Sequence, residues 1–151
     1  MASLLAAAVG AGILAAAGRR ESDLLAVAGY YWLGVVLVEA FVFDVDSFSE
    51  GGWSAIAGAA GLLAGGYVHR LLSPAAGLRD VVFGVVATIA AIAAALGIAD
   101  LVDGRVSGGL GLTAVALVYA ALAAGVFRRA GFRDVATPLW ALALVLVIGA
   151  E

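Results

Sequence analysis

One carboxylate, Glu39, stands inside an apolar stretch, and it is the first residue whose type and position could do chemistry. The stretch reads "AGYYWLGVVLVEAFVFDVD" and covers residues 28–46. An ionisable side chain in such a segment costs free energy unless it is paired or reached by water, so Glu39 is a candidate proton- or cation-binding group. The alternative is a carboxylate near the edge of the apolar layer, hydrogen-bonded to a neighbouring helix. Both interpretations stay open.

Three aromatic residues, Tyr30, Tyr31 and Trp32, precede Glu39 in the same stretch. At helical spacing Trp32 shares a face with Glu39. An aromatic cluster in a chain rich in small residues could wall a pocket, or it could fill a core otherwise made of alanine and glycine. We take Glu39, Trp32, Tyr31 and Tyr30 as the candidate ion, proton or ligand site.

Few other chemical groups are present in the sequence. The chain has no cysteine and one histidine, His69, which excludes disulfides, thiolate catalysis and a multi-histidine metal or haem site within one chain. We find no nucleophile–base pair and no phosphate-binding loop. The sequence therefore predicts no metal site, no cofactor and no enzymatic activity.

The composition indicates where these residues must sit. Of 151 residues, 65% are hydrophobic and 13% are charged, and the mean hydropathy is +1.15. Such a chain cannot cover itself with polar groups in water, so we expect it to lie in a lipid bilayer. All eight basic residues are arginine, which is typical of a GC-rich genome and compatible with a halophile. No basic block points to a nucleic-acid partner.

Six apolar segments predict an all-α, polytopic integral membrane helical bundle, with residues 1–151 as a single transmembrane domain. A crossing takes about 20 residues. The segments are 3–18, 24–43, 53–68, 81–99, 110–127 and 135–150. The last contains Pro138, which is tolerated in a first helical turn. Five spans plus a re-entrant or surface segment is the alternative.

Arginines alternate between the connections, and arginine favours cytoplasmic loops. The first, third and fifth connections hold seven of the eight: Arg19, Arg20, Arg70, Arg79, Arg128, Arg129 and Arg133. The pattern predicts a multi-pass protein of the plasma membrane with both termini outside. Glu39 then lies in the outer half, roughly 8 Å past its helix centre, and on the order of 20 Å along the axis from His69. We therefore interpret His69 as an interfacial histidine rather than a partner of Glu39.

An acid opens the helix after each arginine-rich connection. Asp23, Asp80 and Asp134 recur about 55 residues apart, where each can cap free N–H groups and complement the helix dipole. The repeat predicts three antiparallel hairpins. It is equally well explained by duplication or by one constraint met three times.

Small residues at four-residue spacing let membrane helices approach closely. The strongest such stripe is Ala57, Gly61 and Gly65; Ala8, Gly12 and Ala16 form another. Because alanine and glycine are abundant here, either stripe could also arise by chance.

The stretch "DLVDGR" at residues 100–105 resembles the opening of the signature of the CDP-alcohol phosphatidyltransferases, membrane enzymes that bind divalent metal through aspartates on two helices. Asp100, Asp103 and Gly104 match it, but no later aspartates follow. Too few oxygen ligands remain for a cation and its phosphates, so we interpret the stretch as an acidic turn.

Two functions remain open. The first is a non-catalytic accessory or scaffold protein whose partners are the lipid bilayer and either a second copy or another membrane protein. The alternative is a small transporter or channel subunit that uses Glu39 as its proton- or cation-coupling carboxylate.

The arginine pattern predicts that a reporter fused after Glu151 is active only outside the cytoplasm. A fusion in the fifth connection, after Arg129, serves as the matched control and is expected to report the cytoplasm. A cytoplasmic signal from the Glu151 fusion would contradict this topology.

Overall fold

The computed structural model is all-helical and describes residues 2–42, 51–73, 78–102, 105–128 and 133–150. Within them lie six helices: α1 (Ala2–Arg20), α2 (Asp23–Val42), α3 (Gly51–Leu72), α4 (Leu78–Leu101), α5 (Arg105–Phe127) and α6 (Arg133–Gly149). Helices α1 to α5 are long and apolar enough to cross a membrane by length and composition. Six helices are confirmed within these ranges, and α6 is apolar but shorter than the five that are long enough to cross.

The helices extend beyond most of the apolar segments that predicted them. Helix α3 gains residues at both ends, so that it includes His69 and Arg70. Helix α6 has 17 residues and starts at Arg133, which places Pro138 two residues deeper in the helix than expected. Proline lacks the N–H that would bond to the carbonyl of residue 134. This apolar helix is the shortest of the six described helices.

The turn between α1 and α2 is tight and defined by local hydrogen bonds. Glu21 adopts a left-handed conformation, with a φ of 50°, and the Ser22 amide donates to the Ala17 carbonyl at 3.1 Å. This is the Schellman arrangement that ends many helices. The Ser22 hydroxyl then accepts from the Leu25 amide at 3.4 Å. The cap of α2 is therefore Ser22, and Asp23 is left free to act elsewhere.

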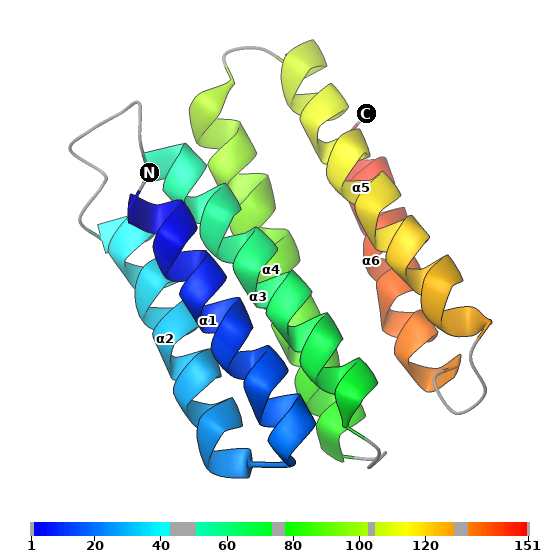
Figure 1. Cartoon of the computed structure of the whole chain (residues 1–151). Coiled ribbons are helices and arrows are strands. Elements are labelled where there is room, and N and C mark those ends of the chain that lie inside the picture. Colours follow the sequence, from blue (N-terminus) through cyan, green and yellow to red (C-terminus); the bar gives the residue numbers. More distant parts are fainter. Residues whose placement is uncertain (1, 43–50, 74–77, 103–104, 129–132, 151) are drawn as a thin grey trace.

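Consecutive helices run in opposite directions and lie side by side (Figure 1). Helix α3 packs most extensively, against α1 and α4, and α2 lies against both α1 and α3. The α5–α6 pair contacts this four-helix unit mainly through α4. Helices α1, α3 and α5 all finish at one end of the bundle, which we call the arginine end; both chain termini lie at the opposite end (Figure 1).

Helices α1 and α3 approach each other through glycine. A Cβ atom on Gly61 would lie 2.8 Å from the Ala7 Cβ and 3.0 Å from the Ala7 carbonyl oxygen, and one on Gly65 would lie 3.0 Å from the Ala11 Cα. Ala57 is buried on the same helix. The α1 side of this contact is not the expected stripe, since Ala8 is exposed and Gly12 has nothing within 4 Å. The true face is shifted by one residue.

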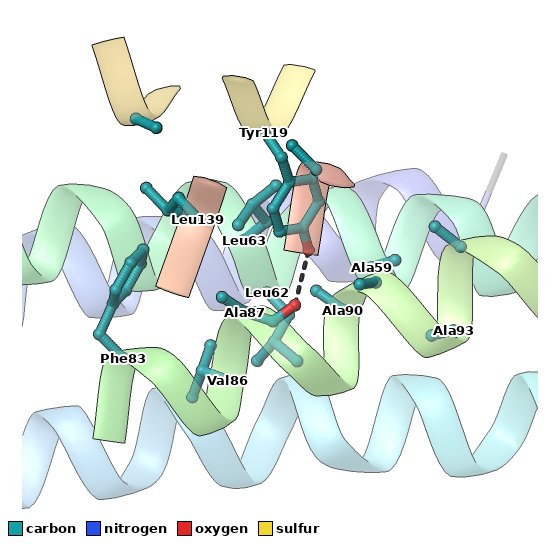
Figure 2. Packing of buried hydrophobic residues seen from close by; sticks show 14 of the residues in the cluster. Ala59, Leu62, Leu63, Phe83, Val86, Ala87, Ala90, Ala93, Tyr119 and Leu139 are labelled. Atoms are coloured by element: carbon teal, nitrogen blue, oxygen red, sulfur yellow. Dashed lines mark hydrogen bonds between the residues drawn. The ribbon is translucent and has the colours of Figure 1, made fainter. Parts of the chain in front are cut away.

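Larger side chains fill the junction between the four-helix unit and α5–α6. Tyr119, Phe83 and Leu139 are almost fully buried there, at 1%, 1% and 0% exposure. Figure 2 shows the Tyr119 ring beside Leu63, with its hydroxyl directed at the carbonyl of Ala87 on α4. That hydrogen bond measures 2.6 Å and ties α5 to α4 in the interior of the bundle.

Replacing Gly61 with alanine is expected to destabilise the protein by about 1–3 kcal/mol, because the new methyl group meets the backbone of α1 and the helices must separate. Gly12→Ala is the matched control on α1. It adds the same methyl group in open space and is expected to be neutral, or stabilising by up to about 1 kcal/mol through helix propensity. Unfolding in detergent measures both; equal effects would contradict the close contact.

Candidate functional site

Glu39 lies on the exposed surface of α2, three residues before the helix ends at Val42. It is seven residues beyond Trp32, a rise of about 10 Å along the helix. The side chain is therefore near the end of the bundle that holds the termini. It does not line any of the three apolar cavities described between the helices.

The three aromatic residues point in different directions, as successive positions on a helix must. Tyr31 is 74% exposed. The Trp32 indole N–H donates to the Ala6 carbonyl of α1 at 2.9 Å. Tyr30 turns inward to α3. The structure thus does not gather Tyr30, Tyr31, Trp32 and Glu39 around one cavity, and two of the four instead bind neighbouring helices.

The arginine end of the four-helix unit holds a polar cluster that centres on His69. The Tyr30 hydroxyl and the His69 Nδ1 lie 3.2 Å apart, and their rings meet edge to face with centroids 5.8 Å apart. His69 is only 9% exposed. Gly18 of α1 covers it: a Cβ on Gly18 would lie 3.2 Å from the His69 carbonyl oxygen. This histidine is thus buried where α1, α2 and its own helix α3 meet.

A buried ion pair adjoins His69. The Arg70 Nε donates to the Asp80 carboxylate, joining the end of α3 to the start of α4. The side chains are only 4% and 18% exposed. Arg70 Nη1 also donates to the Ser73 carbonyl at 3.1 Å. Asp80 therefore holds a cation from the previous helix, in addition to its favourable place in the first turn of α4.

A second ion pair links the first two hairpins. Arg79 Nη2 donates to Asp23 Oδ1 at 3.1 Å, and the two side chains are 27% and 86% exposed. Arg79 lies in the first turn of α4 and Asp23 is the first residue of α2, so the pair joins two helices through residues that are 56 positions apart in the chain. Arg19, Arg20 and Arg128 are exposed at the same end. Arg129 and the side chain of Arg133 lie outside the described residues.

Sequence reasoning missed this cluster, although its members were visible. The acids that begin α2 and α4 were expected to cap their own helices, and the arginines to orient the chain. Each acid also pairs with an arginine from another helix. The signal that could have found the pairs was the repeat itself, since an acid beside an arginine at every odd connection offers partners across neighbouring hairpins.

An apolar cavity of about 200 Å³ lies between α3, α4 and α5, and we call it the α3–α5 cavity. Its lining consists of aliphatic side chains and one ring: Ile56, Ala59, Ala60, Leu63, Ala90, Ala94, Val115, Val118 and Tyr119. The Tyr119 hydroxyl is already bonded to the Ala87 carbonyl. The cavity therefore offers hydrocarbon contacts.

No group of three or more histidine, aspartate or glutamate side chains within the described ranges is placed to hold a metal ion. Asp100 is exposed near the end of α4, and Asp103 and Gly104 lie outside those ranges. No protein-family model, curated protein or solved structure matches the chain. Its function must therefore be argued from its own geometry.

Asp80→Asn is expected to destabilise the protein by about 3–5 kcal/mol, because it leaves the buried Arg70 cation without its carboxylate. Asp23→Asn is the matched control: it removes an exposed partner of Arg79 and is expected to cost about 0–1 kcal/mol. Denaturant titration in detergent measures both. A loss for Asp80→Asn no larger than that for Asp23→Asn would contradict a structural role for the buried pair.

Proposed function

We propose that this chain is a multi-pass integral membrane protein with a non-catalytic role, as an accessory subunit or scaffold. Its apolar helices would face lipid, and some of their exposed surface would contact another membrane protein or a second copy. The proposal extends to the orientation: the arginine end would lie in the cytoplasm and both termini outside the plasma membrane.

The observation that carries the proposal is how the polar side chains within the helices are used. Four hydrogen bonds each join a different pair of helices. They are Ser3 to Ser54 at 2.8 Å, Tyr30 to His69 at 3.2 Å, Trp32 to Ala6 at 2.9 Å and Tyr119 to Ala87 at 2.6 Å. Between apolar helices in lipid, such bonds are a main source of cohesion. Polar groups used in this way serve assembly rather than a reaction.

The alternative, transport coupled to Glu39, finds less support in the geometry. A coupling carboxylate needs a polar route that reaches it from one side and releases its ion to the other. Glu39 is exposed beside apolar residues such as Val35 and Val38. A long acidic side chain three residues from a helix end can extend to the head-group region. We therefore assign Glu39 to the lipid–water boundary.

Flux measurements in vesicles test the proposal. The purified chain is reconstituted in vesicles that contain a dye sensitive to pH, Na⁺ or K⁺. Under an imposed gradient of that ion, the vesicles are expected to pass it no faster than empty vesicles do. Glu39→Gln is expected to leave both this baseline and the unfolding midpoint unchanged, because an exposed boundary carboxylate makes little contribution to stability.

Glu21→Gln, which neutralises another exposed acid, is the matched control. Flux by the wild-type chain above that of empty vesicles would overturn the proposed accessory or scaffold role. If that flux disappeared in Glu39→Gln and persisted in Glu21→Gln, Glu39 would be the coupling carboxylate.

A further inference from the structure

The α3–α5 cavity has buried walls and an open side. Five of its lining residues are less than a tenth exposed: Ala59, Leu63, Ala90, Ala94 and Tyr119. Ile56 and Val115 are partly exposed, and Ala60 on α3 and Val118 on α5 are exposed. We call Ala60 and Val118 the mouth of the cavity, because they are its most exposed lining residues.

The neighbouring groove between α2 and α4 is different in kind. It holds about 320 Å³, but its lining includes Val38, Phe41 and Ile92, which are 57%, 38% and 55% exposed. Such a groove is ordinary outer surface. The α3–α5 cavity differs because more than half of its lining residues are buried.

The size and chemistry of the cavity restrict its occupant. Water needs two to four polar partners to fill a cavity, and the Tyr119 hydroxyl is already bonded to Ala87. A helix is about 10 Å across and rises 5.4 Å per turn, so one turn occupies roughly 400 Å³. That is more than the cavity volume of about 200 Å³, so a whole helical turn of a second copy does not fit inside it. Apolar cavities of about 150 Å³ are known to bind benzene.

We propose that the α3–α5 cavity binds part of one hydrocarbon chain of a membrane lipid, which enters sideways between Ala60 and Val118 while the rest of the chain and the head group stay outside. The floor of alanines at positions 59, 90 and 94 provides the width, and the Tyr119 ring forms one wall. Each methylene transferred between lipid and such a pocket changes little in hydrophobic free energy, so selectivity comes from packing. The inference rests on membrane insertion and not on the absence of flux.

A photoreactive lipid tests the proposal. The full chain is reconstituted in phosphatidylcholine vesicles with a trace of phosphatidylcholine that carries a diazirine in one acyl chain, then illuminated and mapped by peptide mass spectrometry. Adducts are expected on the buried walls, at Leu63 and Tyr119, as well as on exposed positions such as Tyr31. Lipid that only surrounds the bundle cannot reach the buried walls.

Ala60→Phe, which places a ring across the mouth, is expected to lose the adducts on the buried walls and keep those at Tyr31. The matched control is Ala28→Phe, the same change at an exposed position of α2. It is expected to keep both sets. Val118→Phe closes the other side of the mouth and is expected to behave like Ala60→Phe.

Wild-type chains without adducts on the buried walls would overturn the proposal, whether the cavity closes in lipid or is filled by protein. Wall adducts that persist in both mouth variants would overturn it as well. Because wild-type labelling decides the question alone, it does so even if a variant fails to fold. Vesicle flux is read separately, so failure of the proposed function and failure of this inference are distinguishable.

Discussion

The close approach of α1 and α3 is the contact on which the rest of the bundle depends. Three glycines make it possible: Gly61 and Gly65 on α3, and Gly18 on α1. In lipid the hydrophobic effect does not drive one helix onto another, so the attraction must come from close packing and a few polar bonds. With α1 and α3 in contact, α2 packs against both of them and α4 packs against α3. Gly18 then lies against the backbone of His69.

The strongest electrostatic contacts collect at one end. The buried Arg70–Asp80 pair and the exposed Arg79–Asp23 pair both lie at the arginine end, where charges are nearest to water in the proposed orientation. Hydrogen bonds between uncharged groups join the helices in the interior, where an unpaired charge would be most costly. The Ser3–Ser54 bond joins α1 to α3 at the opposite end. Polar contacts thus join helices of the four-helix unit at the arginine end and α1 to α3 at the other, and small residues allow close packing between them.

Much of the helix pattern could be predicted from the sequence, because a crossing length and an apolar composition leave few alternatives. Helix ends and contact faces were harder. The α1 face was misplaced by one residue, since Ala11 and Gly12 are both small and only the partner helix distinguishes them. The candidate site was predicted only in part. The three adjacent aromatic residues are visible in the sequence, but the partner of each depends on which helix its side chain faces. The Arg70–Asp80 pair crosses a connection, so spacing within one helix could not reveal it.

The attachment of α5–α6 through α4 has a consequence for how the chain is made. A chain emerges from the ribosome N-terminus first, so α1 to α4 can complete their mutual contacts before α5 exists. The last hairpin then docks on a finished surface. Until it does, the Tyr119 hydroxyl has no Ala87 carbonyl to bind, and an unbonded hydroxyl in hydrocarbon is unfavourable. In the proposed membrane setting, this hydrogen bond would favour docking of the last hairpin on α4 over a separate position in the bilayer.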